Sequence, residues 1–131
     1  MKLTIIIPNY NREKFLSKCL NSCLNQSYEN YQLIFIDNES SDKSLEIAKK
    51  IQSESSKKFI IDTAPNIYPH CWEECIEKAM EYIDGDFFTI VGSDDWLDFD
   101  YLKSLMIGFP AKMKKFSRHS HLFYGLKITK I

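Results

Sequence analysis

The chain has 131 residues, of which 44% are hydrophobic and 14% aromatic, which is enough to form the buried core of one domain. No run approaches the roughly 18 apolar residues that a membrane-spanning helix needs. The apolar run near the amino terminus ends at Pro8 and lacks the longer hydrophobic region of a secretory signal. The sequence therefore predicts a soluble globular domain with a cytoplasmic location.

The formal net charge of −1 conceals two parts of opposite sign. Residues 1–100 hold all 18 acidic residues and 10 of the 17 Lys and Arg, so they carry −8 and the last 31 residues carry +7. The simpler interpretation is a solvated basic face that offsets the acidic part. The alternative is a peripheral contact with anionic lipid at the inner membrane face through Lys112, Lys114, Lys115 and Arg118. Nucleic acid is not expected as a partner, because only this tail would support it.

Short apolar runs alternate with longer amphipathic segments along the chain. Continuous β-branched runs predict strands that are covered on both faces, and apolar residues three and four apart predict helices. The predicted strands are 3–8, 31–37, 58–63 and 85–93, and the predicted helices are 13–26, 41–54 and 70–83. Ser40 or Ser41 is expected to cap the second helix. This order predicts an α/β fold with a mostly parallel sheet and helices on both faces.

Polar residues gather where three of the predicted strands end. The segments are "PNYNR" (8–12), "DNESSD" (37–42) and "SDDWLD" (93–98). Parallel sheets bind ligands at the carboxyl ends of their strands, so we expect these segments to form one site. The sequence contains neither the glycine-rich fingerprint of dinucleotide-binding domains nor a P-loop.

Asp94 and Asp95 directly follow the fourth predicted strand. Adjacent carboxylates repel each other and lose hydration unless a cation lies with them. Mg²⁺ or Mn²⁺ suits such a pair, because these ions prefer carboxylate, phosphate and water oxygens. The alternative interpretation is that Asp94, Asp95 or Asp98 caps a helix over "FDYLKSLM" (99–106).

The segments after the first two strands contain groups that suit a nucleotide. A proline is expected to end the first strand, a tyrosine ring can stack on a base, and amide, guanidinium and carboxylate groups can pair with a base edge or a phosphate. Turn formation and helix capping are the alternative interpretations of these residues. The candidate nucleotide-binding residues are Pro8, Tyr10, Asn11, Arg12, Asp37 and Asn38.

Three stretches in this order, "TIIIPNYNRE", "NQSYENYQLIFIDNESSDKS" and "DGDFFTIVGSDDWL", resemble the nucleotide-binding half of family 2 glycosyltransferases. The resemblance covers roughly residues 2–105 and implies the Rossmann-like half of the GT-A fold, truncated relative to the family. It divides the chain into a donor-binding domain, residues 1–105, and a basic C-terminal segment, residues 106–131, that packs on this domain or extends it.

The resemblance also implies roles for the candidate residues. It places Pro8, Tyr10, Asp37 and Asn38 at the nucleobase, Asp94 near the ribose, and Asp95, with Asp94, on a Mn²⁺ or Mg²⁺ that binds the diphosphate. The implied activity is sugar transfer from a nucleoside-diphosphate sugar, with UDP favoured, to a hydroxyl of a glycan or lipid-linked acceptor in polysaccharide synthesis. In inverting members a carboxylate later in the chain acts as the general base.

The sequence departs from the family pattern at several positions. Asn38 stands where a second acid is usual, and Gly92 stands where many members have the first acid of an Asp-x-Asp motif. Ile76 and Glu77 replace an Arg-Asn pair that lies near the diphosphate in the family. Phosphate binding is therefore expected to be weaker or to come from other residues.

The last 31 residues contain no Asp or Glu, so the general base is not assigned. His119 and His121 are more typical of a basic surface than of a catalytic base. Our hypothesis is that the chain is a donor-binding half, and the alternative is a non-catalytic module that binds a nucleotide or nucleotide sugar. The apolar residues of the tail are expected to cover a sheet face or to form a homodimer contact.

The four cysteines form two C-x-x-x-C pairs within predicted helices, Cys19 with Cys23 and Cys71 with Cys75. This spacing places each pair on one helical face. We expect buried core thiols, since small thiols are common in the cores of cytosolic proteins, and a four-thiolate zinc site is the alternative.

Overall fold

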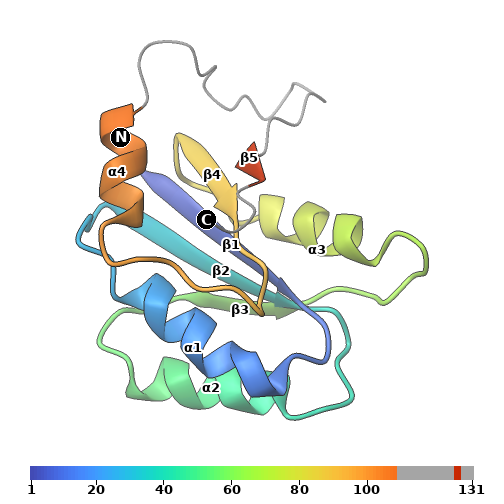
Figure 1. The fold of residues 1–131 in the computed structure, drawn as a ribbon. Helices are drawn as coiled ribbons and strands as arrows, with labels where there is room; N and C mark the ends of the chain where they lie inside the picture. The colour runs from blue at the N-terminus through green and yellow to red at the C-terminus, as the bar shows by residue number, and fades with distance from the viewer. Residues whose placement is uncertain (109–125, 128–131) are drawn as a thin grey trace.

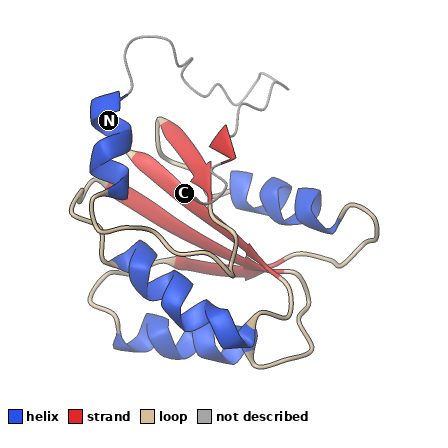
Figure 2. Ribbon diagram, viewed as in Figure 1, coloured by secondary structure: helices blue, strands red, loops and turns tan. Residues whose placement is uncertain are grey.

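A computed structural model describes residues 1–108 and 126–127 of the chain. Its strands are β1 (Leu3–Asn9), β2 (Tyr31–Asp37), β3 (Ile60–Thr63), β4 (Phe87–Ile90) and β5 (Leu126–Lys127), and its helices are α1 (Glu13–Leu24), α2 (Ser44–Glu54), α3 (Cys71–Met80) and α4 (Tyr101–Gly108). The strands form one sheet in the order β3-β2-β1-β4-β5, and every neighbouring pair is parallel (Figures 1 and 2). The predicted α/β fold with a parallel sheet is confirmed.

The helices cover both faces of the sheet. On one face, Leu3, Ile5 and Ile7 of β1 pack with the buried residues of α1 and α2. On the other face, Ile6 of β1 packs with the buried residues of α3. Because successive side chains of a strand point to opposite faces, β1 at the centre of the sheet is buried along its whole length. This explains why the strand is apolar without alternation.

Pro8 does not end the first strand as predicted. β1 continues through Pro8, which pairs in register with Ile36, and on to Asn9, whose carbonyl accepts a hydrogen bond from Asn38 N–H at 2.8 Å. The β1–β4 ladder stops at Ile6, whose carbonyl still accepts from Val91 N–H at 2.9 Å. Pro8 lies two residues beyond Ile6, so its missing N–H faces the side where β4 has already left the sheet, and no ladder bond is lost.

The predicted serine caps of the second helix are wrong. α2 begins at Ser44, and its first amide donates to Asp42 Oδ1 at 2.9 Å. The Ser40 hydroxyl instead donates to Asp37 Oδ1 at 2.7 Å, and the Ser41 amide donates to Asn11 Oδ1 at 2.8 Å. Ser40 is therefore hydrogen-bonded to the end of β2, and Ser41 is hydrogen-bonded to the loop after β1.

α4 follows the acidic segment and packs on the sheet face that α1 also covers. Leu102 is fully buried in this core, and Tyr101, Leu105 and Met106 pack against it. The start of the predicted tail thus covers part of the sheet, as one of the two alternatives proposed. The remaining tail residues that carried predictions lie outside the described residues: Lys112, Lys114, Lys115, Arg118, His119 and His121.

Buried core thiols are confirmed for three cysteines. Cys19 and Cys23 of α1 and Cys75 of α3 are buried, whereas Cys71 is half-buried. Cys19 and Cys23 pack in one core cluster and Cys75 packs in the other, on the opposite face of the sheet, and the described residues hold no group of three or more metal ligands, so the four-thiolate zinc site is wrong. Within residues 1–108 and 126–127, no helix is long and apolar enough to span a bilayer.

Gly85 lies where the chain enters β4, against the backbone of β1. A Cβ at this position would lie 2.7 Å from Thr4 Oγ1 and 2.9 Å from the Lys2 carbonyl oxygen. We expect Gly85→Ala to lower the free energy of unfolding by about 1–3 kcal/mol, since backbone must shift to admit the methyl group. Urea denaturation measures this, with the exposed Lys49→Ala as a control that changes stability by less than about 0.5 kcal/mol. An unchanged urea midpoint for Gly85→Ala would contradict the close approach.

Candidate functional site

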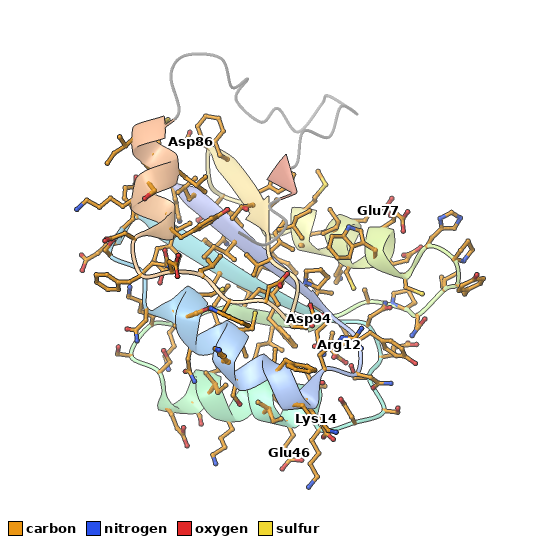
Figure 3. The ribbon with its side chains drawn as sticks, viewed as in Figure 1. Arg12, Lys14, Glu46, Glu77, Asp86 and Asp94 are labelled. Carbon is orange, nitrogen blue, oxygen red and sulfur yellow. The ribbon has the colours of Figure 1, made fainter. Side chains whose placement is uncertain are left out.

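The three polar segments predicted from the sequence meet at the carboxyl edge of the sheet. β1 lies between β2 and β4 and is parallel to both, so the residues that follow the three strands emerge on the same side. Asn9 Nδ2 donates to Asp37 Oδ1 at 2.9 Å, which joins the first two segments. Arg12 Nε lies 4.0 Å from Asp94 Oδ2, which joins the first and third (Figure 3).

Asp37 is the centre of the network between β1 and β2. It is only 2% exposed, and its carboxylate accepts hydrogen bonds from Asn9 Nδ2, from the Ser40 hydroxyl and from the Ser40 amide at 2.9 Å. The Ser40 oxygen in turn accepts from Asn9 Nδ2 at 3.2 Å and from the Asn11 amide at 3.0 Å. Asn9 and Ser40 are site residues that sequence reasoning missed. A polar residue closing a buried apolar strand was the available signal for Asn9.

Asn11 binds the loop after β1 to the loop before α2. Its Oδ1 accepts from the amides of Ser41 at 2.8 Å and Asp42 at 3.2 Å, and its Nδ2 donates to the Ser41 hydroxyl at 3.2 Å. Asn11 has a φ of 48°, in the left-handed region that Asn tolerates better than most residues. Beside this network Tyr10 is 48% exposed, so its ring lies at the rim of the site.

Asn38 is also buried, at 2% exposure, and its amide group accounts for the departure from the family pattern. Asn38 Nδ2 donates to the carbonyls of Ala64 at 3.3 Å and Pro65 at 3.0 Å, after the end of β3. A carboxylate at this position would have no hydrogen to donate and would face two carbonyl oxygens. Asparagine therefore fixes the β3 end against the β2 end.

The acid loop, residues 91–100, brings the Asp94 and Asp95 carboxylates together over Gly92. A Cβ on Gly92 would lie 3.1 Å from Asp94 Oδ1 and 3.1 Å from Asp95 Oδ2. The absence of a side chain at residue 92 thus leaves a small cradle that both carboxylates face. A turn closed by the Asp95 amide on the Gly92 carbonyl at 2.9 Å produces this arrangement.

The capping alternative for these acids is wrong. In the first turn of α4, the Tyr101 amide donates to the Asp98 carbonyl at 3.0 Å and the Leu102 amide donates to Gln26 Oε1 at 3.0 Å. Among the hydrogen bonds of residues 1–108, no α4 amide donates to a side chain of Asp94, Asp95 or Asp98. These carboxylates are left for another partner.

The donor set of the acid loop fits a hard divalent cation. The described residues contain no cluster of three or more His, Cys, Asp or Glu side chains that could hold a metal, so the protein offers two carboxylates here. Mg²⁺ and Mn²⁺ commonly bind in this way, with phosphate and water oxygens filling the other positions. The Arg12–Asp94 pair does not replace such an ion, because both side chains are about half exposed, at 49% and 55%.

α3 supplies no cation at the two positions where the family has Arg and Asn. Ile76 is 6% exposed and packs in the core, and Glu77 points outward from α3 (Figure 3). Lys78 pairs with Glu81 at 3.0 Å and with Asp62 at 3.5 Å. Two cations lie near the acid loop: Arg12 is beside Asp94, and Lys18 Nζ lies 3.5 Å from the centroid of the Trp96 ring.

Two buried thiols lie directly beneath the site. Cys19 Sγ donates to the Gly92 carbonyl at 3.5 Å, and its interaction with the Cys23 thiol, together with burial, raises its pKa far above the ordinary value. Burial raises the pKa of the Cys75 thiol to about 12, and the negative charge of Asp37 acts in the same direction. Both thiols are neutral at physiological pH, which excludes them as nucleophiles.

The fold and the site define an α/β domain with an acidic loop at the carboxyl edge of a parallel sheet. The family model described as "Glycosyl transferase family 2" matches residues 4–111. The chain belongs to glycosyl transferase family 2.

Relatives and solved structures agree with this membership. The dolichyl N-acetyl-alpha-D-glucosaminyl phosphate 3-beta-D-2,3-diacetamido-2,3-dideoxy-beta-D-glucuronosyltransferase of Methanococcus voltae is 35% identical over 108 residues, which are 78% of this chain and 32% of the relative. An uncharacterized glycosyltransferase of Haemophilus influenzae is 39% identical over 102 residues, 77% of this chain and 39% of the relative. S. aureus TarS 1–349 in complex with UDP-GlcNAc is 25% identical with a TM-score of 0.65, covering 82% of this chain and 30% of TarS 1–349. The chain thus spans about a third of the length of these proteins and has the fold of the GT-A nucleotide-binding half.

We expect the thiols beneath the site to resist alkylation. Since raised pKa values leave Cys19 and Cys75 protonated at pH 8, and Cys23 is buried, iodoacetamide should label only Cys71 in the folded protein. Intact-mass measurement should show one adduct before unfolding in guanidinium and four afterwards, and Cys71→Ser should show none before unfolding. Rapid native labelling at Cys19 or Cys75 would contradict the structure.

Proposed function

We propose that this domain binds a nucleoside-diphosphate sugar through a divalent cation held by Asp95 and Asp94. The observation that carries the proposal is the convergence of both carboxylates on the bare Cα of Gly92, at the carboxyl edge of a parallel sheet. Neither carboxylate caps α4, and each is at least partly exposed, so both are accessible to a ligand. Family membership supports the same assignment.

The nucleoside occupies the edge formed by the β1 and β2 ends in this proposal. Tyr10, at the rim, stacks on the base, while Pro8, Asp37 and Asn38 shape the subsite from below. Because the Asp37 carboxylate already accepts three hydrogen bonds, its contribution is mainly to hold Asn9 and Ser40 in place. Asp94 lies toward the ribose, and Asn11 and Arg12 offer their remaining donors to the base edge and the diphosphate.

The proposed chemistry is sugar transfer to a hydroxyl group. Negative charge grows on the diphosphate as the glycosidic bond breaks, and a bound divalent cation stabilises that charge without moving a proton. Asp94 and Asp95 would hold the cation, and the Arg12 guanidinium, 4.0 Å from Asp94, would add positive charge near the diphosphate. We assign none of the described residues to the acceptor site or to the general base.

Uridine is the base that we favour, and a glycan or lipid-linked molecule is the acceptor. TarS 1–349 is described in complex with UDP-GlcNAc, and relatives are named for compounds of dolichyl phosphate, PP-undecaprenol and poly(ribitol-phosphate). We therefore propose a role in cell-surface polysaccharide or glycan synthesis. A cytoplasmic location, contact with the inner membrane face and a homodimer stay predictions.

A second candidate is a binding module without turnover. The specific observation in its favour is that α3 offers the site no cation in this structure, since Ile76 packs in the core and Lys78 pairs with Glu81 and Asp62. Both candidates bind the nucleotide, and only the first transfers the sugar. Release of UDP from UDP-sugars in the presence of candidate acceptors separates them.

We expect UDP binding to depend on Mn²⁺ and on Asp95. Isothermal calorimetry of UDP with and without Mn²⁺ should show tighter binding with the ion, and Asp95→Ala should lose this enhancement, a change of more than about tenfold. Asp98→Ala removes the same charge from the same loop but does not face Gly92, so it should keep the enhancement. Equal Mn²⁺ dependence in the unmodified and Asp95→Ala proteins would overturn the metal site.

A further inference from the structure

A polar strip along α1 and its end holds the acid loop. Cys19 and Ser22 lie three residues apart on one face of α1, and Gln26 follows just after the helix. In Figure 1 the chain between β4 and α4 runs back across α1 before α4 begins. Each of the three side chains is hydrogen-bonded to this returning chain or to the start of α4.

Gln26 makes the most extensive of these contacts. It is 4% exposed, and its Nε2 donates to the Asp98 carbonyl at 2.8 Å and to the Ser22 carbonyl at 3.1 Å. Its Oε1 accepts from the Leu102 amide at 3.0 Å. One buried side chain therefore ties the end of α1 to the end of the acid loop and to the first turn of α4. Removing it would leave buried backbone groups without partners, which is costly.

Ser22 and Cys19 hold the earlier part of the loop. The Leu97 amide donates to the Ser22 hydroxyl at 3.0 Å, and this hydroxyl donates to the Cys19 carbonyl at 2.8 Å. The Cys19 thiol donates to the Gly92 carbonyl at 3.5 Å. The two anchored positions, Gly92 and Leu97, flank the two converging carboxylates.

We infer that Gln26, together with Ser22, is a positioning residue for the acid pair. It touches neither the cation nor the nucleotide, and it acts by fixing the loop backbone so that Asp94 and Asp95 face the same point over Gly92. The inference rests on the proposed function, because the ligands that respond are the divalent cation and the nucleotide. Residues that orient metal ligands in this way typically change metal affinity by 10- to 100-fold when removed.

The chain offers a matched control in Gln32. Its Nε2 donates to the Tyr82 carbonyl at 2.8 Å, and its Oε1 accepts from the Thr4 hydroxyl at 3.1 Å and the Asp84 amide at 3.3 Å. Gln32 thus also joins distant segments with three hydrogen bonds, but it lies near the start of β2, at the opposite end of the sheet from the acid loop. Met at either position keeps a similar side-chain volume and removes all of these hydrogen bonds.

The experiment compares Gln26→Met with Gln32→Met by hydrogen exchange and by Mn²⁺ binding. We expect amide exchange in residues 94–102 to be faster in Gln26→Met than in Gln32→Met. Amide exchange in β1 and β2 should be the same in both variants. Mn²⁺ affinity in the presence of UDP, measured from the electron paramagnetic resonance signal of the free ion, should fall about tenfold or more in Gln26→Met. It should stay within about twofold in Gln32→Met.

Ser22 provides a second pair of variants, which serves if Gln26→Met does not fold. Ser22→Thr keeps the hydroxyl and should retain Mn²⁺ affinity, whereas Ser22→Ala should lower it and expose the Leu97 amide to exchange. Unchanged exchange of the loop in both Gln26→Met and Ser22→Ala would overturn the inference.

Two further outcomes separate the inference from the proposed function. Normal Mn²⁺ and UDP binding by the unmodified protein, with equal losses in Gln26→Met and Gln32→Met, would overturn the positioning role alone. Absence of Mn²⁺ and UDP binding by the unmodified protein would overturn the proposed function and the positioning role with it.

Discussion

The parallel pairing of β1 with both β2 and β4 is the constraint on which the site depends. It brings Asn9 opposite Asp37 and ends the β1–β4 ladder at Ile90, so the loops that follow all emerge at one edge. A slip of one residue would exchange the two faces of β1, whose side chains fill both core clusters. The hydrophobic core therefore fixes the register, and the register places the polar groups.

The hydrogen bonds of Asp37 hold the aligned ends of β1 and β2 together and form the rigid base of the site. Hydrogen bonds to a charged group contribute more than neutral ones, roughly 1.5–3 kcal/mol each, so the contacts from Asn9 and Ser40 hold the two strand ends firmly. These hydrogen bonds resist a large rearrangement of the two strand ends, while Tyr10 and Arg12 are exposed at the rim. A buried network with an exposed rim suits a site that must recognise a ligand without refolding around it.

The sequence predicted the elements well wherever local pattern decides them. The bounds of β2 agree with the prediction, and the segments 8–12, 37–42 and 93–98 meet as expected. The start of α2 was wrong because Ser40 bonds to a neighbouring strand end rather than to its own helix. Gln26 was missed because its partner Asp98 lies 72 residues later in the chain. Contacts of this kind arise from the topology, which no local pattern encodes.

The side chains of the strip on α1 that bond to the acid loop, those of Cys19, Ser22 and Gln26, carry no charge. The loop holds four carboxylates, and the cations near it are Arg12 at 4.0 Å from Asp94 and Lys18 on the Trp96 ring. An amide, a hydroxyl and a neutral thiol bond to the loop backbone, so these contacts do not involve the Asp94 and Asp95 carboxylates. The loop backbone is therefore held without help from a ligand, and binding of the proposed cation would not spend free energy on ordering it.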